Sequence, residues 1–297
     1  MVNVYLLAQN NGYTLIDTAI GTNDAFIALD QGLKSIGAEW AAVKRIIVSH
    51  LHPDHTGLVP RLRELSKAPV LMNRQDAVLL DQVTGGPAKA EELRSVLVRG
   101  GVETAFADAV TATYIKIARS FPRFEPDEFL HDGDALETSL GTWKVILTPG
   151  HAPGHVCLYN AEHRLLFSGD QVIEDITPHI GWLPDRDSLG EFLESMERLA
   201  ELDARMILPS HGVPFSGLRP WIERTVRHHE DRCRQLEQLL RPGPQTVAQL
   251  VAAIWKRDLK PFDYQLGFTE ILSHLEFLRS RGRISSQGKP VELWTVL

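Results

Sequence analysis

The chain has 297 residues, of which 43% are hydrophobic, and a net charge of −7 at pH 7. This length has room for more than one domain, and the composition supports a full hydrophobic core and argues against disorder. An acidic chain is a poor candidate for a general nucleic-acid binder, whose surface is usually basic. Its two cysteines, Cys157 and Cys233, fit no CxxC spacing and indicate no disulfide framework. We find no signal peptide and no apolar run of about 18 residues, so we expect a cytoplasmic protein with no membrane partner.

The N-terminal part predicts alternating strands and helices, as in an α/β fold. Apolar runs typical of strands alternate with segments of helical periodicity. In chain order, the predicted elements are strands at 2–8 and 13–19 joined by a turn at 9–12, a helix at 23–36, a strand at 45–48, a helix at 58–66 and a strand at 69–72.

Residues 74–127 differ in character from the segments before them. Long helical patterns at 88–99 and 104–120 are separated by Gly100 and Gly101, and we expect a helical insertion that lies over the functional site. Strands return afterwards. They are predicted at 143–147, 156–159 and 165–167, and are followed by an amphipathic helix at 189–202 and a last strand at 206–208.

The C-terminal part shows a third pattern. A polar helix at 221–241 is expected to link a domain at 1–220 to the rest of the chain. Residues 242–297 then contain helical segments at 246–255 and 269–281, followed by a hairpin-like pair of strands. Two helices and a two-stranded wing are the order of a winged-helix domain, which we predict here.

The strongest chemical signal is the run Ser-His-Leu-His-Pro-Asp-His-Thr-Gly, directly after a predicted buried strand. On an extended segment, side chains two positions apart share a face, so His50 and His52 can bind one metal ion. The chain then turns at the proline, so Asp54 and His55 can bind a second ion nearby. Imidazole and carboxylate groups suit zinc, and also iron or manganese.

Three more candidate ligands follow other strand-like runs. His151 lies in Thr-Pro-Gly-His, Asp170 in Phe-Ser-Gly-Asp and His211 in Leu-Pro-Ser-His-Gly. Because side chains at the ends of neighbouring strands converge on one cleft, we expect these residues to join the histidine cluster.

The combined pattern resembles the metallo-β-lactamase superfamily. His-x-His-x-Asp-His, Pro-Gly-His, Gly-Asp and a late His-Gly, preceded by Asp17 in Thr-Leu-Ile-Asp-Thr, match its five motifs over about residues 1–216. The resemblance implies an α/β fold with a four-layer αββα sandwich, here followed by the small winged-helix domain. For this fold the chain begins close to its first strand, so we expect that an edge strand is absent or the start truncated. The implied ligand sets are His50, His52 and His151 for one metal and Asp54, His55 and His211 for the other, with Asp170 bridging them.

Such a site predicts hydrolysis. Two divalent ions about 3.5–4 Å apart can share a hydroxide, because metal binding lowers the pKa of water toward neutrality. The hydroxide attacks an electrophilic carbonyl or phosphorus atom. Asp54 is both a ligand and a candidate proton shuttle, so it is the predicted catalytic residue. We expect two zinc ions, with iron and manganese as alternatives.

Five further residues are predicted around these ligands. The resemblance assigns Asp17 a supporting role behind the metal-site loops. His155 is expected to support the site through hydrogen bonds. His179 and Trp182, in the loop after the bridging aspartate, and Tyr114, in the helical insertion, are weaker candidates for the substrate pocket, with ordinary loop or helix-surface positions as the alternative.

The complete ligand set favours a hydrolase of a small-molecule thioester, ester or lactone. A bridging aspartate resembles glyoxalase II, lactonases, phosphodiesterases and nucleases of this fold. True β-lactamases generally lack that aspartate, so β-lactam hydrolysis is a lesser alternative, as a promiscuous activity.

The C-terminal pattern adds two alternatives. It resembles the lactamase-like beta proteins, a branch that includes a single-strand endoribonuclease, so metal-dependent cleavage of RNA is the main alternative. Arg279, Arg281 and Arg283 form a basic spot at the wing, which fits RNA or equally a solvated helix end. The non-enzymatic alternative is a winged-helix DNA-binding regulator with a sensing domain. The sequence predicts no oligomeric state.

Overall fold

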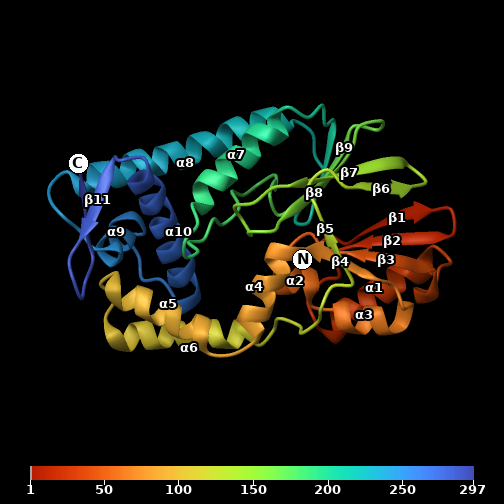
Figure 1. Ribbon diagram of the computed structural model, residues 1–297, viewed down its shortest axis with the longest axis horizontal. Coiled ribbons are helices and arrows are strands. Elements are labelled where there is room, and N and C mark those ends of the chain that lie inside the picture. Colours follow the sequence, from red (N-terminus) through yellow and green to blue (C-terminus); the bar gives the residue numbers. More distant parts are fainter. Residues whose placement is uncertain (1) are drawn as a thin grey trace.

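The computed structural model describes residues 2–297, and its core holds two five-stranded β-sheets (Figure 1). In the first sheet, β1 and β2 form the predicted antiparallel hairpin, and β2 to β5 run parallel to one another. The five strands lie side by side in the same order in which they follow one another in the sequence. The bounds are β1 Tyr5–Gln9, β2 Gly12–Ile16, β3 Val43–Ile47, β4 Val70–Asn73 and β5 Glu128–Leu130.

The second sheet has the order β10-β9-β8-β7-β6. Its strands pair antiparallel, except that β10 runs parallel to β9. A parallel neighbour needs a crossover, and helix α7 supplies it. The bounds are β6 Ala135–Thr138, β7 Gly141–Leu147, β8 Val156–Asn160, β9 Leu165–Gly169 and β10 Met206–Pro209.

The sheets pack face to face and carry helices on their outer faces. Neighbouring side chains on a strand point to opposite faces, so Ile47 joins Trp143 and Phe167 between the sheets, whereas Ile46 packs outward with Leu33 and Leu62 of the covering helices. Figure 1 shows α1 and α3 on the first sheet and α7 and α8 beyond the second. The predicted four-layer αββα arrangement is confirmed. These helices are α1 Asn23–Ser35, α2 Pro53–Thr56, α3 Val59–Ser66, α7 Ser188–Ala200 and α8 Leu218–Leu240.

The insertion contains α4 (Arg74–Thr84), α5 (Ala88–Arg99) and α6 (Thr104–Ala118), which confirms the helix break at Gly100 and Gly101. Gly100 is required by packing, because a Cβ atom there would lie 2.4 Å from the ring of Phe268. Phe268 belongs to the C-terminal helix α10, so α5 and α6 lie beside the C-terminal elements (Figure 1).

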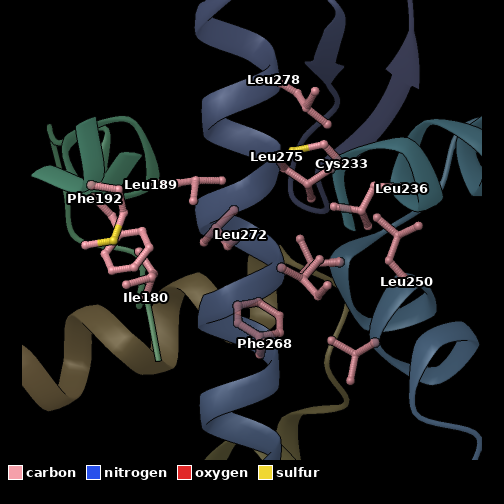
Figure 2. Packing of buried hydrophobic residues seen from close by; sticks show 14 of the residues in the cluster. Ile180, Leu189, Phe192, Cys233, Leu236, Leu250, Phe268, Leu272, Leu275 and Leu278 are labelled. Atoms are coloured by element: carbon pink, nitrogen blue, oxygen red, sulfur yellow. The ribbon is translucent and has the colours of Figure 1, made fainter. Parts of the chain in front are cut away.

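The C-terminal segment consists of α9 (Val247–Ile254), α10 (Pro261–Ser280) and the antiparallel pair β11 (Ile284–Gln287) and β12 (Leu293–Val296). Helix α10 is surrounded by apolar side chains of α7, α8 and α9 (Figure 2). The segment therefore shares one core with the helices that cover the second sheet. The winged-helix assignment and the boundaries at 220 and 241 stay predictions.

Several elements differ from the sequence expectations. The short strands β5 and β6 are not predicted, and α10 begins at Pro261, about two turns before the predicted start. Within residues 2–297, no helix combines the length and the apolar character needed to cross a bilayer.

Candidate metal centre

The predicted ligands lie at the ends of strands, where the chain leaves the two sheets. Strand β3 ends at Ile47, and the chain continues to His52, the residue that precedes the short helix α2. Proline at the first helical position is favourable, because its fixed φ suits a helix and its missing N–H needs no partner there. His50 and His52 therefore come from the connecting segment, and Asp54 and His55 from the helical turn.

Three imidazoles form the first ligand group, which consists of His50, His52 and His151. His50 Nε2 lies 2.9 Å from His52 Nδ1, and His151 Nε2 lies 3.1 Å from the same nitrogen. The three rings meet nearly edge to face, with centroids 4.6, 4.7 and 5.0 Å apart. Their nitrogen atoms thus surround one point.

The second ligand group consists of Asp54, His55 and His211. Asp54 Oδ2 lies 3.5 Å from His55 Nε2 and 3.2 Å from His211 Nε2. His55 is buried, whereas the side chains of Asp54 and His211 are 35% and 28% exposed. The second group therefore forms the open side of the site.

Asp170 lies between the two groups. Its Oδ2 atom is 4.0 Å from His50 Nε2 and 3.7 Å from His151 Nε2 in the first group. In the second group, His55 Nε2 lies 3.5 Å from Oδ1 and His211 Nε2 lies 3.4 Å from Oδ2. One carboxylate thus reaches both groups.

Hydrogen bonds behind the ligands direct their ring nitrogens inward. His151 Nδ1 donates to the carbonyl oxygen of His179 at 2.9 Å, and His55 Nδ1 donates to Asp17 Oδ2 at 2.9 Å. A histidine that donates through Nδ1 can present an Nε2 lone pair to a metal. Both rings are therefore oriented for binding through Nε2.

The first group is electrically neutral. Burial and the neighbouring histidines lower the pKa of His50 well below its usual range. Burial and the proximity of His151 lower the pKa of His52 to about 3. Burial likewise lowers the pKa of His151. Neutral imidazoles are the form in which histidine binds metals.

In the second group, neighbouring carboxylates favour the protonated forms of His55 and His211. Hydrogen bonds with Asp170 and Asp54 raise the pKa of His211 to about 9. Burial would lower the pKa of His55, but Asp17 and Asp170 raise it well above its usual value. Burial would raise the pKa of Asp54, but its hydrogen bond with His211 lowers it to about 2. A cation entering this group must therefore displace protons.

Asp17 joins the loops that carry the ligands. The side chain is fully buried, and its oxygens accept from the Ser49 N–H at 2.8 Å, the Ser49 hydroxyl at 2.9 Å, His55 Nδ1 at 2.9 Å and the Ser210 hydroxyl at 3.3 Å. The backbone of Asp17 has a positive φ of 62°, which is uncommon for a non-glycine residue. Ser49 and Ser210 directly precede His50 and His211, so one carboxylate connects three ligand positions.

His155 lies behind the ligands. Its Nδ1 lies 2.8 Å from the Thr148 hydroxyl, and its Nε2 accepts from the backbone N–H of Asp170 at 3.1 Å. Gly169 makes this contact possible, because a Cβ atom there would lie 2.4 Å from His155 Nε2. The structure thus places His155 where it orients the backbone of Asp170.

Asp76, near the start of α4, is a residue that the sequence analysis missed. Its carboxylate is fully buried and accepts from the Leu51 N–H at 2.8 Å and the Gly154 N–H at 2.5 Å. Leu51 lies between two ligands and Gly154 lies in the loop of His151, so Asp76 ties both loops together. The only local signal is an acidic residue in the first turn of a predicted helical segment, which is too common to indicate a site.

Replacing Asp76 by asparagine should loosen both loops. The amide group can accept from only one of the two N–H donors and turns its own N–H₂ group toward the other. We expect zinc affinity to fall about tenfold, the lower end of the range for groups that support metal ligands. Zinc titration of Asp76→Asn against Asp81→Asn, an exposed position in the same helix, measures this. Equal affinities in the two variants would contradict the role of Asp76.

The three residues predicted to line the substrate pocket lie in different parts of the structure. His179 contacts His151 through its carbonyl oxygen, and Trp182 follows in the same loop. Tyr114 instead lines a cavity of about 390 Å³ between α4, α5 and α6, and none of the predicted ligands lines this cavity. The structure therefore brings His179 to the site and leaves Tyr114 apart from it.

The donor set fits divalent metal ions. His55 Nε2 and Asp170 Oδ1 are buried 3.5 Å apart, and within residues 2–297 neither makes a hydrogen bond. Such atoms are costly to bury unless a ligand compensates them. In each of three sets, the ligand atoms lie within 4.8 Å of one another. These sets are His50, His52 and His151; His50, His55 and Asp170; and Asp54, His55 and His211.

A two-layer sheet core with clustered histidines and aspartates at the strand ends defines a class of metal-dependent enzymes. The chain belongs to the metallo-β-lactamase superfamily, whose family model matches residues 1–211. It is a metallo-hydrolase of this superfamily. This assignment favours an enzyme over the alternative of a DNA-binding regulator.

Its relatives include proteins similar over nearly the whole chain. The probable metallo-hydrolase YqjP of Bacillus subtilis is 24% identical, over 96% of this chain and 90% of its own length. A metallo-beta-lactamase family protein of Thermus thermophilus, TTHA1429, has a crystal structure that aligns with a TM-score of 0.84 at 31% identity, over 100% of this chain and 94% of that one. The lactamase-like protein adaB of Aspergillus niger is 26% identical over 79% of this chain, which spans only 57% of adaB.

Proposed function

We propose that the chain uses two divalent metal ions to hydrolyse a small-molecule thioester, ester or lactone. The observation that carries this proposal is the position of Asp170, whose carboxylate reaches both ligand groups. Two divalent ions bound by these groups would supply a hydroxide nucleophile at neutral pH and would polarise the bond under attack.

The residues divide into distinct roles in this proposal. The first ligand group would hold one ion and the second group would hold the other. Asp170 would contribute to the binding of both ions. Asp54 is the catalytic residue, because its side chain is 35% exposed, compared with 11% for Asp170. An ionised carboxylate on the open side of the site can pass protons between the reacting group and solvent.

The arrangement of the wing supports a small substrate over RNA. Each of the three arginines of the predicted basic spot pairs with a carboxylate of this chain, so an RNA phosphate would have to compete with these pairs. The pairs are Arg279 with Glu276, Arg281 with Asp187 at 2.7 Å and Arg283 with Glu237 at 2.7 and 2.8 Å. Endoribonuclease activity and promiscuous β-lactam hydrolysis are alternative outcomes of the substrate test below.

We propose zinc as the metal, because three neutral imidazoles form a typical zinc site. Iron is the alternative, since TTHA1623, a related protein 26% identical over 76% of this chain, was crystallised in a di-iron-bound form. A cytoplasmic location stays a prediction.

Metal analysis tests the two-ion site. We expect close to two ions per chain in the wild type, and no measurable turnover after Asp54→Ala, because this change removes a ligand and the proton shuttle together. Asp24→Ala, at an exposed position in α1, is the matched control and should keep both ions and full turnover. A wild-type stoichiometry near zero with intact histidines would reject the proposal.

A substrate panel tests the bond that is broken. The panel contains thioesters, lactones, a β-lactam, bis-p-nitrophenyl phosphate and a single-stranded RNA. We expect turnover of the carboxylic substrates that is lost in Asp54→Ala. Cleavage of RNA without cleavage of any carboxylic substrate would overturn the proposal in favour of a nuclease.

The affinity for zinc should rise with pH up to about 9. The pKa of His211 is raised to about 9, so below this pH a proton occupies the ligand nitrogen and competes with the metal. Each pH unit below that value should weaken binding about tenfold for this proton. Competition with a chelator at several pH values measures the slope, which His211→Ala should reduce. A slope that is the same in both proteins would contradict this assignment.

A further inference from the structure

Helix α10 holds the loop that follows Asp170. The backbone N–H of Trp182 donates to the carbonyl oxygen of Thr269 at 3.0 Å. The hydroxyl of Thr269 lies 3.4 Å from His179 Nε2, and Glu270 Oε2 lies 4.0 Å from His179 Nδ1. Two adjacent residues of α10 therefore meet both ring nitrogens of His179.

The residues after His179 pack closely within the loop. A Cβ atom on Gly181 would lie 3.0 Å from His179 Nε2, so the loop follows the ring closely. Ile180 is fully buried in the apolar cluster that includes Phe192 (Figure 2). The backbone of His179 is thus fixed on both sides of its own side chain.

Glu270 is itself held in place from α8. Arg232 Nη2 lies 4.0 Å from Glu270 Oε1, and the guanidinium carbon of Arg232 lies 5.0 Å from the ring centre of Trp255. Both side chains are mostly buried, with exposed fractions of 14% for Arg232 and 19% for Glu270. Buried charges are costly unless paired, so this pair restricts where the carboxylate can lie.

The same loop orients a predicted metal ligand. The carbonyl oxygen of His179 accepts from His151 Nδ1 at 2.9 Å, and this bond sets the direction of His151 Nε2. Thr269 and Glu270 lie outside the residues matched by the family model, which end at 211. Contacts from the C-terminal segment therefore reach the metal centre through one intermediate residue.

We propose that Thr269 and Glu270 are positioning residues of the metal centre: they hold His179, whose carbonyl oxygen orients His151. The inference rests on the proposed function, since it takes His151 as a metal ligand. It makes the C-terminal segment a structural part of the metal site rather than an attached module.

The test is the zinc dissociation constant, measured by competition with a chelator. Glu270→Gln, Thr269→Val and His179→Ala should each weaken binding about tenfold, as expected for groups that orient a metal-bound histidine. Glu276→Gln is the matched control on the same helix, where Glu276 pairs with Arg279, and it should bind zinc like the wild type.

A double variant tests the route through His179. If Glu270 acts only through that residue, Glu270→Gln combined with His179→Ala should bind zinc no more than about twofold weaker than His179→Ala alone. Thermal unfolding of the metal-free proteins shows whether each variant is folded. Should Glu270→Gln fail to fold, Thr269→Ser, which keeps the hydroxyl, is compared with Thr269→Val and should retain wild-type affinity.

Two results would overturn the inference and leave the proposed function intact. One is a wild type that binds two ions while Glu270→Gln and Thr269→Val bind zinc as tightly as Glu276→Gln. The other is a double variant whose loss equals the product of the single losses. A wild type that binds no zinc at all rejects the proposed function and this inference together.

Discussion

Replacing Asp170 by asparagine should reduce the metal content from two ions to about one and lower kcat/KM by about a thousandfold or more. The amide has the shape of the carboxylate but no charge, and it turns an N–H₂ group toward a ligand. Bound metal contributes several kcal/mol to the stabilisation of the transition state, which corresponds to this fall in rate. Metal analysis and steady-state kinetics measure the two effects on the same samples.

The metal-free protein offers an independent readout of the same change. Asp170 is the largest cause of the raised pKa of His211, so that pKa should fall from about 9 toward the usual value in Asp170→Asn. Imidazole resonances followed by NMR against pH report this shift without any substrate. Asp175→Asn, an exposed position in the following loop, is the control. Two bound ions and an unchanged pKa of His211 in Asp170→Asn would contradict the bridging position.

Replacing Asp17 by alanine should have the second large effect, on stability and on metal binding together. Four donors lose their buried acceptor, among them His55 Nδ1 and the Ser49 N–H. Removing one partner of a buried charged network costs about 3–5 kcal/mol in the free energy of unfolding. Because His55 also loses the group that orients its ring, zinc affinity should fall about 10–100-fold.

Denaturant unfolding of the metal-free chain separates the two parts of this expectation. Asp17→Asn keeps the size of the side chain and should restore part of the stability, while the loss of metal affinity remains. A variant of Asp24, in the exposed first turn of α1, should change stability by only a few tenths of a kcal/mol. An Asp17→Ala protein as stable as that control would contradict the network around Asp17.

The three arginines near β11 show how the sequence pattern alone can mislead about surface charge. Arg279, Arg281 and Arg283 form a basic spot in the sequence, and such spots often bind nucleic acid. In the structure their partners include Asp187 and Glu237, which lie far away in the chain. Two of the three arginines are therefore paired by tertiary contacts, and Arg279 pairs with Glu276 on its own helix.

The candidate ligands and the two-sheet architecture could be predicted from the sequence. His50, His52, Asp54 and His55 lie within six positions after a strand, a density of metal-binding groups that local spacing alone makes visible. The break between α5 and α6 was equally local, because paired glycines end a helical pattern. Short β5 could not be predicted, since three residues carry no periodicity and its pairing with β4 defines it. The start of α10 is not predicted because its first two turns mix half-buried and exposed residues and carry no clear amphipathic stripe.

The contacts that hold the site together become visible only in the folded chain. Asp76 and Glu270 look like ordinary acidic residues on helices, and nothing near them in the chain indicates a role. Their partners are Leu51, Gly154 and His179, which are 25, 78 and 91 positions away. The same applies to the cluster of His50 to His55: spacing indicated the ligands, but the position of Asp170 between two groups came from the packing of β3 and β9 in different sheets. Candidate ligands can be predicted from residue type and local spacing. The groups that orient these ligands cannot, because they are side chains from distant parts of the chain that folding buries beside the ligands.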